Sequence, residues 1–121
     1  MTDTDRKWLT KLIGECWHPS WTHEEGISIC DRCNLKMKPL DIQAGKSRRT
    51  FTTWVDFGVL WEAMDKKGLL TKFLEEHGDC WLGEGVGNCC WDTRQVIDPI
   101  RFPLLILQFR DERKELFKEE I

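Results

Sequence analysis

The chain has 121 residues, a formal net charge of −3 and a pI of about 5.6. This length fits one domain with a modest core, and the acidic balance excludes a surface that attracts nucleic acid over its whole extent. Residues 1–7 are charged, which argues against a signal peptide, and every apolar run is too short to predict a membrane span. The six cysteines therefore indicate reduced or metal-bound thiols in a reducing compartment.

The first predicted element is a short helix over residues 4–13. Thr4 is a suitable N-cap, and Gly14 is expected to end the helix. The apolar residues recur at helical spacing and form one face: Trp8, Leu9, Leu12 and Ile13.

Three cysteines and one histidine follow in a spacing typical of structural zinc sites. The chain reads Cys16-Trp17-His18 and then, after eleven residues, Cys30-x-x-Cys33. Three thiols and one imidazole make a tetrahedral Cys₃His set. We therefore predict one structural zinc ion, in a zinc-knuckle subregion over residues 14–40, with these ligands: Cys16, His18, Cys30 and Cys33.

The residues around the second cysteine pair predict a hairpin. Residues 27–29 and 35–37 alternate apolar and polar side chains, which is typical of two short strands. Asn34 follows the second cysteine, where such turns need a residue that tolerates positive φ. His23 is the alternative imidazole ligand, although His18 lies at the better spacing from Cys16.

Other uses of these cysteines fit less well. Nothing upstream indicates export, which disfavours a disulfide, and no βαβ pattern surrounds the pair, which disfavours a thioredoxin-like redox site. His23-Glu24-Glu25 invites comparison with the zinc deaminases, but only four residues separate it from Cys30, and no proline precedes that cysteine. A zinc ion with four protein ligands also has no position for a reactive water.

The most basic part of the chain is residues 36–50, which we expect to be irregular and exposed. It holds one acidic residue, Asp41, against five basic ones: Lys36, Lys38, Lys46, Arg48 and Arg49. A solvated loop is one interpretation. The other is an arm beside the zinc site that contacts phosphates, which would make these five residues a nucleic-acid-binding set.

A second, longer helix is predicted between Thr53 and Gly68. Thr53 is a good N-cap, and Asp56 is expected to complete a variant of the capping box. A core-facing stripe runs through Phe57, Leu60, Trp61 and Met64, and Trp54 is expected to extend it. Gly58 inside the helix predicts a close packing contact there.

The remainder of the chain predicts two further helices and a hairpin. Residues 69–77 are expected to be helical, with a strand from Leu69 as the alternative, and residues 79–97 to form the hairpin. Asp98-Pro99 is expected to open the last helix. Pro103 disturbs an interior turn, so the regular part of this helix is expected to begin near Phe102. From Arg110 onward we expect a solvated helical tail, which includes Leu116 and Phe117.

The later cysteines offer a second possible metal cluster, in which His77 and Cys80 would join Cys89 or Cys90. Adjacent cysteines do not easily face one ion from a regular strand, so we interpret Cys80, Cys89 and Cys90 as structural thiols. No catalytic triad, nucleophile elbow or phosphate loop is present in the sequence, which predicts a protein that is not an enzyme.

Together these patterns predict an α+β fold: a small helix-rich single domain, residues 1–121, with a zinc-knuckle hairpin near the N-terminus. Residues 51–121 would form the helical core with its short hairpin.

Four stretches carry a resemblance to a known group of proteins. They are Gly14-Glu15-Cys16-Trp17-His18, Cys30-x-x-Cys33, the run from Phe51 to Glu62, and Asp98-Pro99-Ile100-Arg101-Phe102. In this order they resemble small uncharacterised proteins of tailed bacteriophages and prophages. Asn34 departs from the glycine common in that group, and the cysteines after residue 79 are additional.

The resemblance implies a phage accessory protein that acts in the host bacterial cytoplasm, and it implies no reaction. Our first hypothesis is therefore a protein with a structural zinc site that binds a host protein, for example to inhibit a host defence system. The alternative is a zinc-knuckle module that binds nucleic acid weakly through the basic residues of 36–50. A metalloenzyme is the least favoured of the three.

Overall fold

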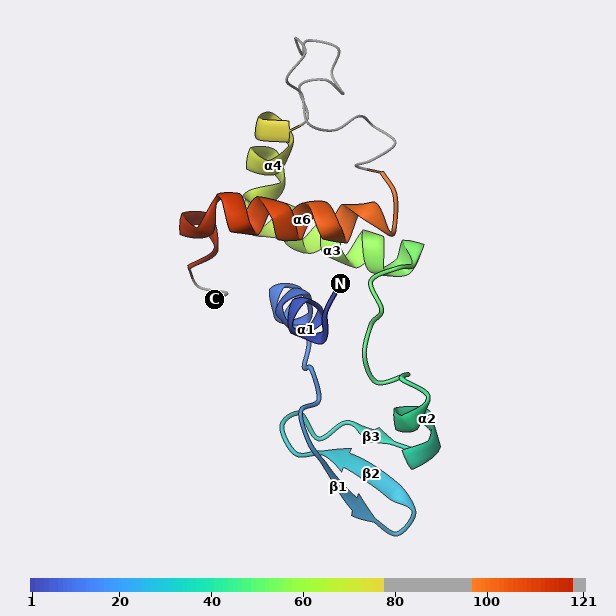
Figure 1. Cartoon of the computed structure of the whole chain (residues 1–121). Coiled ribbons are helices and arrows are strands. Elements are labelled where there is room, and N and C mark those ends of the chain that lie inside the picture. The colour runs from blue at the N-terminus through green and yellow to red at the C-terminus, as the bar shows by residue number, and fades with distance from the viewer. Residues whose placement is uncertain (78–96, 119–121) are drawn as a thin grey trace.

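The computed structural model describes residues 1–77 and 97–118 (Figure 1). It has α+β architecture, as predicted, in this order: α1 (Asp3–Leu12), β1 (Trp21–Glu24), β2 (Ile27–Cys30), β3 (Lys36–Met37), α2 (Pro39–Gln43), α3 (Trp54–Lys66), α4 (Leu69–His77), α6 (Arg101–Glu112) and the 3₁₀ helix η1 (Lys114–Phe117). Most of the hairpin predicted over 79–97 lies outside the described residues, as do Cys80, Cys89 and Cys90.

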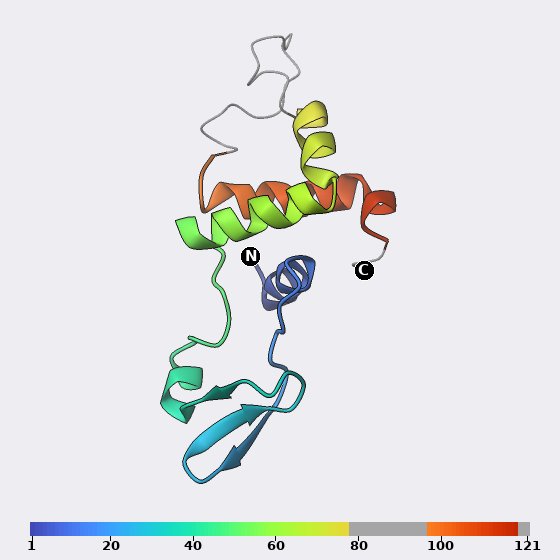
Figure 2. The same cartoon turned by 180° about the vertical axis from the view of Figure 1, so that it is seen from behind.

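The elements form two parts. Helices α1, α3, α4 and α6 make a helical body, and the three-stranded sheet with α2 makes a knuckle at the opposite end of the molecule (Figures 1 and 2). Two linkers, residues 13–20 and 44–53, join the parts. Within the described ranges, no helix combines the length and the apolar character that crossing a bilayer requires.

Helix α1 begins two residues earlier than its predicted cap implies. Thr2 Oγ1 accepts a hydrogen bond from the Asp5 backbone N–H at 3.1 Å, and Asp5 Oδ2 accepts one from the Thr2 N–H at 3.2 Å. This reciprocal pair is a capping box. Thr4 cannot form one, because the residue three positions later is Lys7, which has no acceptor.

The core of the helical body is aromatic and centres on Phe102 of α6. Its ring centroid lies 4.9 Å from that of Phe57, 5.6 Å from that of Trp61 and 5.8 Å from that of Phe73. Edge-to-face and tilted rings at these distances pack favourably beyond the area that they bury. Because Phe57 and Trp61 belong to α3, these contacts hold α3 beside α6 (Figures 1 and 2).

The predicted stripe of α3 is confirmed at its centre and wrong at its start. Leu60 and Met64 are fully buried, but Trp54 is 61% exposed. Trp54 is the first residue of the helix, and its ring centroid lies 5.3 Å from that of Phe57. The close contact predicted at Gly58 is also wrong, since a Cβ built there would meet no atom of the described residues within 4 Å.

Asp98 accepts hydrogen bonds from the backbone at the start of the final helix. Asp98 Oδ1 accepts hydrogen bonds from the N–H groups of Ile100 at 2.8 Å and Arg101 at 2.9 Å, and α6 starts at Arg101. Pro103 therefore falls in the first turn, where an N–H has no intrahelical acceptor and its loss costs little.

The end of the described chain is not a solvated tail, as predicted. Phe117 is fully buried, and its ring packs edge-on against Trp8 at 5.4 Å and Phe109 at 5.7 Å. Arg113 leaves helical geometry, with φ −129° and ψ 58°, and so η1 turns back onto the core. The mixed charge of this segment predicts a solvated tail, and it gives no indication that Phe117 is buried.

The knuckle is an antiparallel sheet in the order β1-β2-β3. Glu25 and Gly26 join β1 to β2, both with positive φ (49° and 80°), which is the geometry of a two-residue type I′ turn. The hairpin predicted around the second cysteine pair is confirmed as β2 and β3. Residues 36–50 are less irregular than predicted, because α2 begins at Pro39, a residue suited to the first helical position.

Candidate metal centre

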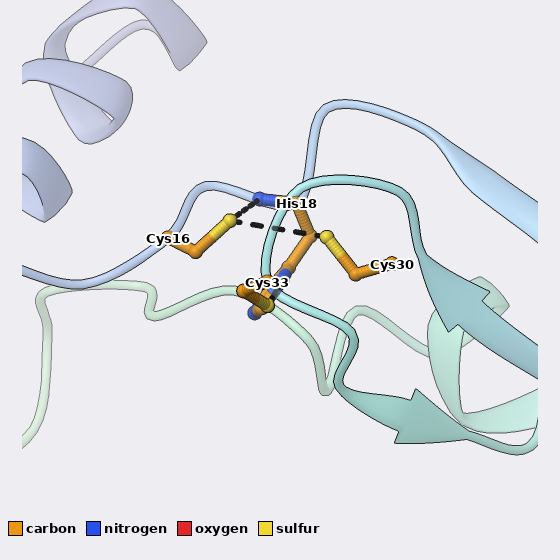
Figure 3. Close-up of side chains that lie close together, drawn as sticks. All are labelled: Cys16, His18, Cys30 and Cys33. Atoms are coloured by element: carbon orange, nitrogen blue, oxygen red, sulfur yellow. Dashed lines mark hydrogen bonds between the residues drawn. The ribbon is translucent and has the colours of Figure 1, made fainter.

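The four predicted ligands lie together between the knuckle and the helical body (Figure 3). Cys16 and His18 stand on the linker after α1, Cys30 ends β2, and Cys33 lies in the turn before β3. One potential ligand atom from each residue lies within 4.8 Å of all the others. The four residues come from separate parts of the chain. They lie close together because the linker after α1 passes the end of the sheet where Cys30 and Cys33 lie.

The Cys30-x-x-Cys33 turn favours the thiolate form of Cys30. The Asn34 N–H donates to the Cys30 carbonyl oxygen at 2.9 Å, and Asn34 has the predicted positive φ, 64°. Burial raises the pKa of Cys30, but N–H donors of Cys33 and Arg32 and the His18 ring lower it by more, to about 6. Stabilising a thiolate in this way favours metal binding, because the thiolate is the ligand form.

The Cys16-Trp17-His18 turn brings the other two ligands inward. The His18 N–H donates to Cys16 Sγ at 3.3 Å. His18 has φ 58°, which is uncommon for a residue other than glycine, and its side chain is buried beside the ring of Trp21. The strained backbone turns the imidazole toward Cys33, whose Sγ lies 3.3 Å from His18 Nδ1.

The spacing of these atoms fits a tetrahedral metal ion. A zinc ion with bonds of about 2.3 Å to sulfur and 2.0 Å to nitrogen holds sulfurs about 3.8 Å apart and a sulfur and a nitrogen about 3.5 Å apart. The Cys16 and Cys30 sulfurs are 3.8 Å apart, and the contact between Cys33 and His18 is 3.3 Å. These two separations are close to the values for a bound ion, so the four residues are placed to hold one metal ion.

The electrostatics of the cluster also favour a bound cation. The Leu35 N–H lowers the pKa of Cys33, but desolvation and the sulfurs of Cys30 and Cys16 raise it by more. Ionised sulfurs repel one another at this separation. A divalent ion removes this conflict, because it allows all three thiols to ionise together.

His23, the alternative ligand, is not part of the cluster. The register of β1 and β2 places it opposite Ser28, whose Oγ lies 2.5 Å from His23 Nδ1. Trp21 is the residue of β1 that pairs with Cys30, so His23 stands two residues further from the site. The structure thus selects His18.

Arg48 fastens the Cys-Trp-His turn to the second linker. Its Nε donates to the Trp17 carbonyl oxygen at 2.9 Å and its NH2 group to that of His18 at 3.2 Å. The guanidinium carbon also lies 4.0 Å from the centroid of the Trp17 ring. Arg48 belongs to the basic set of the nucleic-acid-binding interpretation, and in this structure it supports the backbone that carries His18, a candidate metal ligand.

Arg49 joins the second linker to the first linker and to the first turn of α3. It donates to the two carboxylate oxygens of Glu15 at 2.7 and 2.8 Å and to Asp56 Oδ1 at 2.8 Å. These hydrogen bonds raise the pKa of Arg49 and lower that of Glu15. No sequence signal connects residues 34 positions apart, and the Glu15–Arg49–Asp56 network was therefore missed.

The network also corrects the predicted capping box of α3. Thr53 Oγ1 accepts from the Asp56 N–H at 3.2 Å, as predicted. The Asp56 carboxylate does not return to Thr53; it accepts from Arg49 and from the N–H of Phe51 at 3.0 Å. Phe51 is fully buried with φ 58°, so Asp56 stabilises a strained entry into the helix.

The remaining members of the basic set do not share these roles. Lys46 lies 3.5 Å from Asp41, whereas Lys36 and Lys38 are exposed on and beside β3. The five basic residues of 36–50 are thus divided between the metal centre, the helical body and the open surface of the knuckle.

Fold and cluster together define a small α+β protein in which a Cys₃His knuckle, able to bind a metal ion, is fastened to a helical body. Comparison with known proteins adds no relative: no protein family, curated protein or solved structure matches this chain.

Proposed function

We propose that this is a phage-encoded accessory protein of the host cytoplasm, in which a structural zinc ion holds the knuckle and which binds a host protein without catalysing a reaction. Zinc is favoured because the ligand set is Cys₃His, which is typical of structural zinc sites, and because its four ligand atoms lie within 4.8 Å of one another. Four protein ligands leave no open position for water or substrate, which favours a structural role over a catalytic one.

The observation that carries the binding role is an apolar rim at one end of the helical body. Its members stand at the beginnings of α3 and α6, and their exposed fractions are 61% for Trp54, 70% for Val55, 57% for Ile100 and 45% for Leu104. Both beginnings lie at the same end, because the rings of Phe57 and Phe102 are 4.9 Å apart. Exposed apolar residues that gather in this way mark protein-interaction sites more often than single ones do.

The test is capture of the tagged protein from host cells, followed by reconstitution with the purified partner. Trp54→Ser with Val55→Asp removes the α3 half of the apolar rim while keeping residues that suit a first helical turn. Leu40→Asp is the matched control, since Leu40 is 76% exposed but stands on α2 in the knuckle. We expect the double variant to lose the partner and the control to keep it; a partner that both variants retain would contradict the proposal. Inhibition of a host defence system is the role that we would test with that partner.

Nucleic-acid binding is the second candidate, and the exposed Lys36 and Lys38 favour it. Neither has an ion-pair partner among the residues that the structure describes. Two free cations neutralise few phosphates, so we expect weak binding that falls steeply with salt. Fluorescence anisotropy across a salt series decides: sub-micromolar affinity at physiological salt, lost in Lys36→Glu with Lys38→Glu, would place this candidate first.

A further inference from the structure

A cavity of about 520 Å³ lies between α1 and the metal-binding loops. Lys7, Trp8 and Lys11 line it from α1, and Trp17 and Arg32 line it from the two ligand-bearing turns. The volume falls within the range of about 300–1,000 Å³ that is usual for small-ligand sites. None of the functions considered above uses this cavity, which is separate from the apolar rim of α3 and α6.

The lining carries an excess of unpaired positive charge. Lys7, Lys11 and Arg32 have no ion-pair partner within residues 1–77 and 97–118. Glu15 is the one carboxylate in the lining, and both of its oxygens are bound by Arg49. A zinc ion with three thiolates would add one negative charge, so three free cations still outweigh it. The cavity therefore favours an anionic ligand.

The lining also offers two indole rings that are held in place. Arg48 lies over the ring of Trp17 at 4.0 Å, and Arg110 lies over that of Trp8 at 4.8 Å. The rings of Phe117 and Trp8 pack in an edge-to-face arrangement, with their centroids 5.4 Å apart. Fixed indoles provide surfaces on which a planar aromatic group can stack, and nucleobases bind proteins in this way.

We propose that this cavity binds a nucleotide, with its base against the indole rings and its phosphate near Lys7, Lys11 and Arg32. Cations alone would suit an acidic peptide equally well, but the two tryptophans in the lining favour a ligand that is both anionic and aromatic. The same chemistry is presented by a free nucleotide and by the phosphorylated end of a nucleic-acid strand. Binding here does not depend on the protein partner of the apolar rim.

The test is isothermal titration calorimetry of the full zinc-loaded protein with AMP, adenosine and inorganic phosphate as separate probes. Lys11→Gln with Arg32→Gln removes two cations from the cavity. Lys36→Gln with Lys38→Gln makes the same change in net charge on the open face of the knuckle. We expect AMP to bind more tightly than adenosine or phosphate, and at least about tenfold more weakly in the cavity variant than in the control. Zinc content and thermal stability of each variant establish that it is folded.

NMR spectra, a phosphorylated dinucleotide and an acidic peptide test where the ligand binds and which kind of ligand the cavity prefers. The indole N–H signals of Trp8 and Trp17 should shift on addition of AMP in two-dimensional NMR spectra. A 5′-phosphorylated dinucleotide that binds more tightly than AMP would identify a strand end as the source, and the reverse order would identify a free nucleotide. No binding of AMP at about 10 mM, equal weakening in both variants, or tighter binding of an acidic peptide would overturn the proposal.

Discussion

The guanidinium group of Arg48 lies over the indole ring of Trp17, and it also donates hydrogen bonds to the carbonyl oxygens of Trp17 and His18. Trp17 stands between two metal ligands, whereas Arg48 belongs to the linker that leads into α3. One side chain thus couples the shape of the metal-binding turn to the path of the chain into the helical body.

We expect Arg48→Lys to weaken both the knuckle and its hold on the metal. Lysine keeps the charge but cannot reproduce the planar stacking and the two hydrogen bonds of arginine. Because this group is exposed, the free energy of unfolding should fall by only about 1 kcal/mol. Denaturant unfolding and zinc competition with a chelator measure the two effects. Lys38→Arg is the control, and equal behaviour of both variants would deny Arg48 this role.

Metal analysis should find zinc bound by Cys16, His18, Cys30 and Cys33. Cys30→Ser should lose that ion and much of the stability of the knuckle, because metal binding and folding are linked. His23→Ala should keep the ion, since His23 pairs with Ser28 instead. The assignment fails if Cys30→Ser retains its zinc, or if His23→Ala loses it.

Asp56→Asn should destabilise the protein strongly for a substitution near the surface. Asp56 is 5% exposed and accepts hydrogen bonds from Arg49 and from the Phe51 backbone. Losing the charge removes one of the two carboxylates that pair with Arg49 and weakens the acceptor of the Phe51 N–H, so we expect a decrease of about 1–3 kcal/mol in the free energy of unfolding. Asp65→Asn, an exposed change in the same helix, should stay within about 0.5 kcal/mol.

Phe117→Ala tests whether η1 packs on the core of the helical body. A fully buried phenylalanine that contacts Trp8 and Phe109 should cost about 3–5 kcal/mol when it is truncated. Lys118→Ala, at the neighbouring exposed residue, should have little effect. Similar thermal unfolding of the two variants would show that η1 is a solvated tail after all.

Asp98 should contribute to the dependence of stability on pH. Hydrogen bonds from the Arg101 and Ile100 N–H groups lower the pKa of Asp98 in the folded state. A lowered pKa means that this stabilisation is fully present above the unfolded pKa and is lost as pH falls through the folded value. Asn at this position still caps but does not titrate. Wild type should therefore be more stable than Asp98→Asn at neutral pH, and the difference should vanish in acid; a constant difference would exclude the titration.

Spacing within the sequence was sufficient wherever the responsible residues are neighbours. The turn at Asn34 and the helix that begins after Thr53 both follow from interactions across a few residues. For the same reason, the opening at Asp98 was predicted close to its true position. Such interactions depend on local backbone geometry, which residue type largely fixes.

Tertiary structure decided everything that depends on the path of the chain. It selected His18 over His23, assigned Arg48 and Arg49 to structural contacts, and buried Phe117 within a segment that appears solvated. It also opened the cavity between α1 and the metal-binding turns. Each of these contacts joins residues that are distant in sequence, so no local pattern specifies which of many possible pairs will meet. That choice is made by the packing of the aromatic core and by the path of the two linkers.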